Sequence, residues 1–439
     1  MKWIVLAITV VMYGFIIAFP NRKSWAALSA AALMLVLGAL SYFEAGFLAV
    51  LGPFEFGLAE VLEFINPTVL LIFIGALLLA ELFIYSKVPA VIADIIVIKS
   101  PNSGLAILAI LIMTGLISAF IENVATVLVM APIALAICQK LKISPRMFIV
   151  GLAIMSNLQG TATLVGDPPS MIFASYSGYS FNDFFIYNGR LSIFFAVQIG
   201  MIAGALFLYY FFSKTGKSKV KIERDKVNSM FPAILLLVKI GGLAAFSFIF
   251  NGLTIASGFL VIVLAITGFF WYWFIRKEGK TKSWKMLKGL DWDTVFFLVG
   301  IFLVIGAVEK SGLLSDFAGV LSAFIGGNVL LGYILIIVVS VIISGFVDNV
   351  PYIIAMLPVA GTLSTELNLN PELYMFALLI GSCLGGNLTP FGASANVVSL
   401  GILKKHNDPV NFGQWLKISL PFTLITVAAS TVFVWFIWR

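Results

Sequence analysis

The sequence predicts an all-α polytopic membrane protein built from two inverted repeats, each with about five membrane spans and one re-entrant hairpin. Three observations lead to this prediction: an apolar composition, a repeat at a fixed offset, and opposite loop charges in the two repeats. Of the 439 residues, 61% are hydrophobic and only 11% are charged. A soluble domain of this size cannot bury so much apolar surface, so a lipid bilayer has to be its solvent.

Long apolar stretches supply the membrane spans. A spanning helix needs about 20 mainly apolar residues, and examples of such stretches are 3–19, 25–41, 67–84, 191–212, 231–250, 254–275 and 418–437. The first is a span rather than a signal peptide, because it lacks a small-residue cleavage site and because Arg22 and Lys23 follow the apolar run.

The chain repeats itself at an offset of 226 residues, which places Glu122-Asn123-Val124 on Asp348-Asn349-Val350. Identical residues then coincide without a gap: Thr68 and Thr294, Met130 and Met356, Pro132 and Pro358, Ala134 and Ala360, Leu141 and Leu367, Pro145 and Pro371, Ser156 and Ser382, Gly160 and Gly386, Thr163 and Thr389, and Gly166 and Gly392. This register predicts a first repeat over 1–212, a basic linker over 213–230 and a second repeat over 231–439.

Loop charges predict how the repeats are oriented, because cytoplasmic loops collect Lys and Arg. The basic linkers 213–226 and 276–288 are separated by two spans, so both can lie in the cytoplasm. The segment 42–66 has four glutamates and no basic residue, yet its counterpart is the basic linker 276–288. Three further pairs of equivalent loops also differ in charge: Lys140, Lys142 and Arg146 against Glu366 and Glu372; the nearly neutral 175–190 against Lys404, Lys405 and Lys417; and Arg22 and Lys23 against a neutral turn at Asn251.

Opposite charges on equivalent loops predict that each repeat crosses the membrane an odd number of times. The second repeat is then upside down relative to the first, an arrangement that recurs in transporters. Both termini are expected outside a plasma membrane, with the basic linkers in the cytoplasm.

Polar residues interrupt one long apolar run in each repeat. The runs 104–138 and 329–363 are apolar except at Glu122-Asn123 and at Asp348-Asn349. Each run is long for a single helix, so we expect re-entrant hairpins at about 103–139 and 329–363, with the polar tips buried in protein. Asn123 and Asn349 are predicted to cap the second arms of these hairpins, which Pro132 and Pro358 loosen.

A second interruption follows in each repeat. Ser156–Thr163 leads into Gly166-Asp167-Pro168-Pro169, and its counterpart over 382–390 leads into Gly392-Ala393-Ser394-Ala395-Asn396. Unwound stretches of this kind offer carbonyl groups to a cation or helix N-termini to an anion. The two tips and the two breaks are predicted to enclose one pseudo-symmetric site for a substrate or ion, with these candidate residues: Glu122, Asn123, Ser156, Asn157, Thr161, Thr163, Asp167, Asp348, Asn349, Ser382, Asn387, Thr389, Ser394 and Asn396.

Glu122 and Asp348 are the main candidates, because a carboxylate inside the bilayer is costly and intramembrane acids are functional by default. Burial favours the neutral form of a carboxyl group, so either residue can carry a proton at neutral pH. The alternative is that both acids only stabilise a helix N-terminus. Asp167 either lines the site or holds a turn. Lys239 either neutralises an acid or, as we favour, extends to the inside face.

Composition and motifs disfavour other classes of protein. The net charge of +7 comes from basic residues in the connections between spans, so nucleic-acid binding is not expected. Cys138 and Cys383 stand in apolar surroundings, and His406 is expected to be exposed in a polar loop. The sequence has no His-Glu-x-x-His motif and no Ser–His pair inside the membrane, so we expect neither an enzyme nor a cofactor, and no metal beyond a transported Na+.

These motifs resemble the ArsB/NhaD branch of the ion transporter superfamily, which includes arsenite pumps, sodium/proton antiporters, the pink-eyed dilution protein and citrate-transporter-like proteins. The resemblance rests on the two tip triplets with their prolines and on the Gly166-Asp167-Pro168-Pro169 turn. Gly385-Gly386-Asn387 followed by Gly392-Ala393-Ser394-Ala395-Asn396-Val397-Val398 looks especially like the pink-eyed dilution group.

The chain departs from its relatives at three places. Glu122 stands where many relatives have Asp, and Ser170 stands where the Gly-Asp-Pro-Pro motif usually continues with Asn. The dicarboxylate carriers have Ser-Asn-Thr at both tips, which this chain lacks. The resemblance implies a scaffold domain, a mobile transport domain with elevator-like movement, and a homodimer.

The sequence therefore predicts a secondary active transporter, with a proton- or sodium-coupled antiporter of sodium or an arsenite-like oxyacid as the leading function. The alternative is a cation-coupled symporter of an organic anion such as citrate. Two carboxylates with no Arg or Lys in either motif make a poor anion site, although helix N-termini partly compensate. An ion channel is the third class considered.

Overall fold

A computed structural model describes the chain except for residues 20–21, 43–55, 58–60, 62–63, 213–224, 251 and 253. Several charges used to orient the repeats therefore lie outside the described residues. They are the glutamates of the segment 42–66, most of the basic linker 213–230, and the turn at Asn251.

The prediction of an all-α membrane protein is confirmed. The first half of the chain forms α1 (Lys2–Ala18), α2 (Lys23–Tyr42), α4 (Pro67–Ser86), α5 (Val88–Lys99), α6 (Ser103–Ser118), α7 (Asn123–Leu141), α8 (Arg146–Gly160), α9 (Pro168–Ser177) and α10 (Ile193–Phe212). The second half forms α11 (Phe231–Ile249), α12 (Ile255–Phe270), α13 (Lys280–Gly289), α14 (Trp292–Lys310), α15 (Leu313–Ile325), α16 (Val329–Ser344), α17 (Asn349–Glu366), α18 (Pro371–Gly385), α19 (Ser394–Lys405) and α20 (Phe412–Trp438).

Helix lengths and surfaces fit a multi-pass membrane protein. Within the described residues, eight helices are long and apolar enough to cross a bilayer. Large apolar side chains such as Trp3, Phe248 and Phe436 are mostly exposed on the outside of the molecule. Such exposure is unfavourable in water but favourable against lipid tails.

Capping residues explain where many of these helices begin. The side chain of Asn66 accepts from the amide of Val69 at 3.0 Å at the start of α4, where Pro67 occupies the first helical turn. Asn102 caps α6 and Asn328 caps α16 in the same way. A side-chain oxygen here replaces the carbonyl that the first turn of a helix lacks.

The helix bounds recur at the offset found in the sequence. The helix α6 covers 103–118 and α16 covers 329–344, so both of their ends are 226 residues apart. The helices α7 and α17 begin at 123 and 349, again with the same difference. Each pair of helices is joined by a short turn that holds the predicted tip. The opposite membrane orientation of the two halves stays a prediction.

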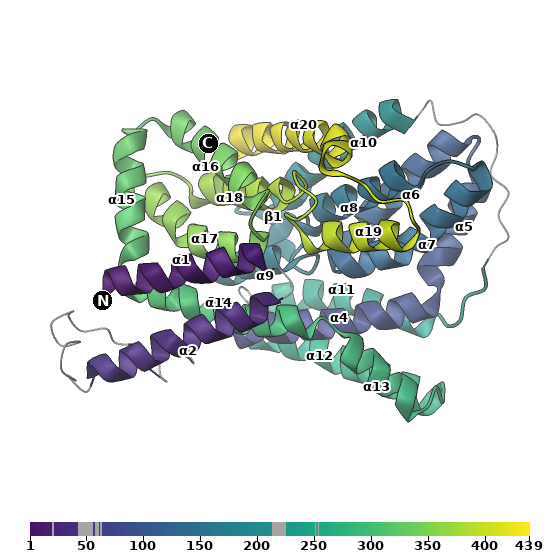
Figure 1. The fold of residues 1–439 in the computed structure, drawn as a ribbon, viewed down its shortest axis with the longest axis horizontal. Helices are drawn as coiled ribbons and strands as arrows, with labels where there is room; N and C mark the ends of the chain where they lie inside the picture. The colour runs from purple at the N-terminus through teal and green to yellow at the C-terminus, as the bar shows by residue number, and fades with distance from the viewer. Residues whose placement is uncertain are drawn as a thin grey trace.

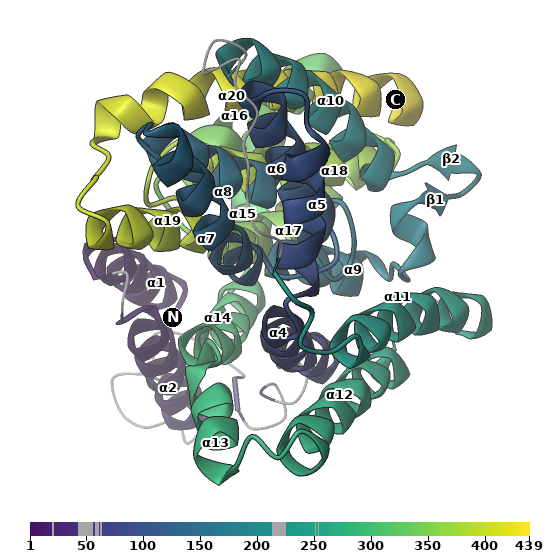
Figure 2. The same ribbon diagram turned by 90° about the vertical axis from the view of Figure 1, so that its right-hand side faces the viewer.

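The helices form two groups, each built from both halves of the chain (Figures 1 and 2). The first helix group contains α1, α2, α4 and α11–α14, in which α4 packs on α12 and α2 packs on α14. The second helix group contains α5–α10 and α15–α20, in which α6 packs on α8, α16 on α18 and α10 on α20. The predicted hairpins both belong to the second helix group.

A short β-hairpin interrupts the loop between α9 and α10, where only a loop was expected. Ile186–Tyr187 pairs antiparallel with Arg190–Leu191. Asn188 and Gly189 both have positive φ, at 49° and 73°, which is the conformation that a two-residue hairpin turn requires. The Asn-Gly pair was the available sequence signal for this hairpin.

One loop charge used in the orientation argument was misinterpreted. Glu372 lies in the first turn of α18, is only 8% exposed and accepts from the hydroxyl of Tyr179 at 3.4 Å. Its carboxyl group is therefore part of the packed interior rather than a charge on a water-facing loop. Glu366 and Lys142 are exposed at the ends of their helices, and His406 is exposed as expected.

The inverted arrangement predicts that cysteines introduced at Lys142 and Glu366 react from opposite faces of the membrane. Labelling intact cells and inverted vesicles with a membrane-impermeant maleimide measures this directly. Cys138 and Cys383 are both free and buried, so the unsubstituted chain serves as the unlabelled control. Reaction of both new cysteines from the same face would contradict the inverted arrangement.

Candidate functional site

A small polar cavity lies where the two helix groups meet, and the two hairpin tips reach it together. Its volume is about 30 Å³, which is room for about one or two water-sized spheres. Its walls contain these residues: Lys23, Phe73, Glu122, Asn123, Asn157, Asp167, Pro168, Asp291, Thr294, Asp348, Asn349, Val350, Ala393, Ser394 and Ala395. Lys23 and Asp348, which are 325 positions apart in the chain, thus line the same cavity.

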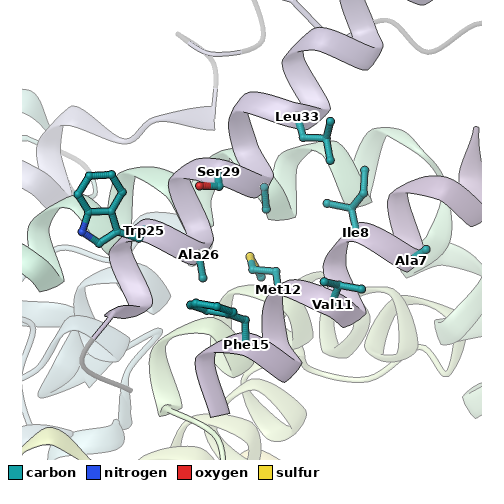
Figure 3. Close-up of a pocket in the computed structure, with 10 residues that line it drawn as sticks. Ala7, Ile8, Val11, Met12, Phe15, Trp25, Ala26, Ser29 and Leu33 are labelled. Atoms are coloured by element: carbon teal, nitrogen blue, oxygen red, sulfur yellow. The ribbon is translucent and has the colours of Figure 1, made fainter. Parts of the chain in front are cut away.

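A larger cavity of about 500 Å³ between α1 and α2 has a different character. Figure 3 shows mainly apolar side chains along it, such as Phe15, Met12 and Leu33, together with the hydroxyl of Ser29. None of its described lining residues is an acid of the kind that intramembrane chemistry requires. The polar cavity is therefore the candidate functional site.

In the described part of the chain, six helices begin at the polar cavity, namely α2, α7, α9, α14, α17 and α19. A helix N-terminus carries about half a positive charge from its aligned peptide dipoles and unpaired amides. Four carboxyl groups, from Glu122, Asp167, Asp291 and Asp348, line the same walls. The converging N-termini explain why acidic side chains gather at this depth.

Glu122 and Asp348 act as N-caps in the structure. The amide of Ala125 donates to Glu122 Oε2 at 3.0 Å, and the amide of Val350 donates to Asp348 Oδ1 at 3.1 Å. The prediction that Asn123 and Asn349 cap these helices is wrong, because the acids stand one residue earlier and take that position. Capping uses one carboxylate oxygen in each case.

The tip asparagines have other partners. Ser118 Oγ donates to Asn123 Oδ1 at 2.8 Å, and Asn349 Nδ2 donates to Asp167 Oδ2 at 3.4 Å. The Asn123 side chain also interacts with the Asp167 carboxyl group, so both tips reach this one acid. The two tips therefore meet at Asp167.

Asp167 differs from the other acids of the cavity. It precedes α9 but makes no capping bond, and it is only 6% exposed. Asp291, in contrast, accepts from the amide of Thr294 at 3.0 Å and from its hydroxyl at 2.6 Å. Of the two interpretations of Asp167, lining the site or holding a turn, the geometry favours the first, because its side chain lines the cavity and makes no capping bond.

The threonines and serines of the breaks support the tips from behind. Thr163 Oγ1 donates to the carbonyl of Ala119, and Thr389 Oγ1 donates to that of Gly345, the same bond in both halves. Ser156 Oγ donates to the carbonyl of Asn123 at 3.1 Å. The carbonyl of Ser382 accepts from Ser344 Oγ. These four candidates are buried and absent from the cavity walls, so they position the tips.

Three asparagine amides join the two breaks. Asn157 Nδ2 donates to Asn387 Oδ1 at 2.8 Å and to Asn396 Oδ1 at 2.9 Å. Asn396 Nδ2 in turn donates to the carbonyls of Gly386 and Thr389. This amide cluster is buried, and only Asn157 also lines the cavity. Of the remaining candidates, Thr161 is buried away from the walls, while Ser394 lines the cavity and is exposed.

Lys23 is the most important residue that the sequence analysis assigned elsewhere. It begins α2, and its Nζ lies 3.1 Å from Asp348 Oδ2. It was interpreted as a loop charge beside Arg22, whereas its side chain is 11% exposed inside the site. Neither motif contains Arg or Lys, but a lysine from outside both motifs thus lies beside Asp348. Asp291 and Phe73 were also missed, and Thr294 was marked only by its match to Thr68.

The interpretation of Lys239 as a side chain that extends to the inside face is also wrong. Lys239 is 1% exposed, and its Nζ donates to the carbonyl of Phe120 at the first tip, at 2.9 Å. At the matching position, Tyr13 donates to the carbonyl of Pro351 beside the second tip, at 3.2 Å. The helices α11 and α1 of the first helix group thus each hold one tip by its backbone.

Comparison with known proteins identifies the family. Residues 4–381 match the family model CitMHS, described as citrate transporter. The chain belongs to this citrate transporter family. It is 30% identical to the uncharacterized transporter Rv2685 of Mycobacterium tuberculosis, over 98% of each protein. It is 24% identical to the human P protein, over 90% of this chain and 56% of that protein.

Solved structures confirm the transporter fold. The YdaH transporter of Alcanivorax borkumensis superposes with a TM-score of 0.63 at 16% identity, covering 94% of this chain and 97% of that one. MtrF of Neisseria gonorrhoeae, described as one of a class of antimetabolite efflux pumps, gives a TM-score of 0.55 at 14% identity, covering 93% and 94%. These structures show the fold, while the family match makes the chain a membrane-embedded secondary transporter. The family match and the P protein also confirm the predicted resemblance to the ion transporter superfamily.

Close packing behind the first tip gives a testable prediction. A Cβ atom at Gly160 would overlap with Asn123 Oδ1, whereas one at Gly401 in α19 would meet no atom within 4 Å. Gly160→Ala is expected to lower the thermal unfolding midpoint in detergent by several degrees, because overpacking costs about 1–3 kcal/mol. Gly401→Ala is the control and should leave the midpoint unchanged or raise it, because Ala favours helix. Equal midpoints for the two variants would contradict this packing.

Proposed function

We propose that the chain is a proton- or sodium-coupled antiporter that moves a small inorganic ion or oxyacid, such as sodium or arsenite, through the polar cavity. The observation that carries this proposal is the meeting of both acid-bearing tips in one cavity between the helix groups. Intramembrane acids that face a shared cavity mark ion pathways and proton relays. The proposal includes a plasma-membrane location with both termini outside.

The charge balance of the cavity supports cation coupling. With all four carboxyl groups counted as ionised, they and the Lys23 ammonium leave three net negative charges among the described lining residues. Six helix N-termini contribute roughly +3 in total, at about half a charge each. The two sums nearly cancel, so one added proton or sodium ion changes the net charge of the cavity. A cargo moving the opposite way restores the balance.

Size supports a small cargo. A free volume of about 30 Å³ accommodates a sodium ion or a comparably small solute but not an organic anion of the size of citrate. Such an anion requires a conformation in which the helix groups stand further apart. Elevator-like movement of the second helix group within a homodimer is part of the proposal, supported by the placement of the cavity at the junction of the groups.

A cation-coupled symporter of an organic anion is the second candidate, and two observations favour it. The family model carries the description citrate transporter. Lys23 and the six helix N-termini supply positive charge that an anion can use once cations neutralise the acids. The two candidates differ in what crosses the membrane and in which direction.

Liposome transport decides between these functions. Purified protein is reconstituted, a proton or sodium gradient is imposed, and sodium, arsenite, chloride and citrate are offered in turn. If the chain is an antiporter, sodium or arsenite should move across the membrane in the direction opposite to the cation whose gradient is imposed. Citrate uptake with the cation gradient would instead support the symporter. A voltage-driven current without any coupled gradient would indicate a channel and contradict both candidates.

The paired acids give a second prediction. Glu122→Gln and Asp348→Asn are each expected to abolish coupled transport in the same assay while insertion and expression stay intact, because the amide can neither ionise nor take up a proton. Glu366→Gln removes an exposed acid at the end of α17 and is the control with normal transport. Normal, gradient-coupled flux in both tip variants would refute the assignment of the acids.

A further inference from the structure

An ion pair distinguishes the second tip from the first. Lys23 and Asp348 join α2 of the first helix group to the hairpin α16–α17 of the second, and their side chains are 11% and 19% exposed. Charges so shielded from water interact more strongly than a surface pair. The ring of Phe297 lies 5.1 Å from Lys23 Nζ and closes one side of the pair.

In the part of the chain that the structure describes, the first tip has no equivalent pair. The residue that corresponds to Lys23 at the repeat offset is Ile249 in α11. Lys239 reaches the first tip but donates to the backbone carbonyl of Phe120. Among the described residues, no ion pair involves Glu122. The two halves thus have similar backbones, but only the second tip has a lysine paired with its acid among the described residues.

The carboxyl group of Asp348 has both oxygens occupied. Its Oδ1 accepts from the amide of Val350 at 3.1 Å, and its Oδ2 faces Lys23 Nζ at the same distance. A sodium ion coordinated by Oδ2 would share this oxygen with the ammonium group and would be repelled by its positive charge. Cation binding at this carboxylate and the Lys23 contact therefore compete with each other.

We propose that Lys23 is a built-in cation that competes with the coupling ion for Asp348 and sets the affinity of the second tip. This inference rests on the proposed cation coupling. When a monovalent cation binds Asp348, Lys23 is released from this carboxylate. It can then turn toward Asp291 and Asp293, two acids of the first helix group that interact with it electrostatically. The same event breaks a link between the two helix groups, so cation binding also frees the second tip.

Binding of radioactive Na+ to purified protein in detergent, at fixed pH, tests this competition. Lys23→Gln is expected to lower the half-saturating Na+ concentration by roughly tenfold or more, because a close charged competitor is removed. Lys23→Arg keeps the positive charge and should bind Na+ like the unsubstituted protein. Lys23→Gln combined with Asp348→Asn should lose the gain.

Lys2→Gln is the matched control. Lys2 forms an ion pair with Asp316 between α1 and α15, far more exposed than the Lys23 pair, so its loss should leave Na+ binding unchanged. Thermal unfolding of every variant verifies that each one is folded. Half-saturation in Lys23→Gln equal to that of the control, or no Na+ binding at all in Lys23→Gln, overturns the inference.

The measurement separates this inference from the proposed function. It needs no gradient and no knowledge of the cargo, because it reports only the occupancy of the site by Na+. Failure of the liposome assay with intact Na+ binding would overturn the antiporter. Coupled transport with unchanged Na+ affinity in Lys23→Gln would overturn only the role of Lys23.

Discussion

Ionised carboxylates are costly inside a bilayer, and in this protein the convergence of helix N-termini offsets that cost. Continuous spanning helices keep their termini at the two membrane surfaces. Only interrupted helices place N-termini deep in the protein, and the chain interrupts two helices in each half, at the hairpin tips and at the breaks before α9 and α19. The polar cavity exists because these four interruptions, together with the starts of α2 and α14, meet at one point.

The interruptions create a second constraint, because each one frees backbone groups that lipid cannot satisfy. The threonines at 163 and 389 bind the freed carbonyls of Ala119 and Gly345, and Lys239 binds the freed carbonyl of Phe120 from the first helix group. Tyr13 of the same group binds the carbonyl of Pro351 in the first turn of α17. Several polar residues near the cavity thus bind the backbone of the tips and do not line the cavity. This division explains why Thr163 and Ser156 are buried beside the site without lining it.

The sequence allowed prediction of the backbone of the site but not of its charge pairing. Both tips and both breaks were visible because Gly, Pro and Asn recur at one offset, and backbone interruptions depend on local residue type. Lys23 follows an apolar run beside Arg22, which is the local pattern of a loop charge. Its partner Asp348 is 325 residues away, and only tertiary packing brings the two residues together. Glu122 and Asp348 were recognised as acids near helix starts. The helices begin one residue earlier than predicted, at Asn123 and Asn349, so the acids rather than the asparagines are the caps.

The amide cluster of Asn157, Asn387 and Asn396 has a consequence for how such a chain can evolve. The Asn157 amide donates to the side-chain oxygens of Asn387 and Asn396, so the cluster joins the two halves of the chain. A replacement in one half strands a polar group of the other half in a dry interior, where it costs about 1–3 kcal/mol. Substitutions at these positions in the two halves are therefore coupled. Either half expressed alone would lack the hydrogen-bond partners that the other half supplies to these amides.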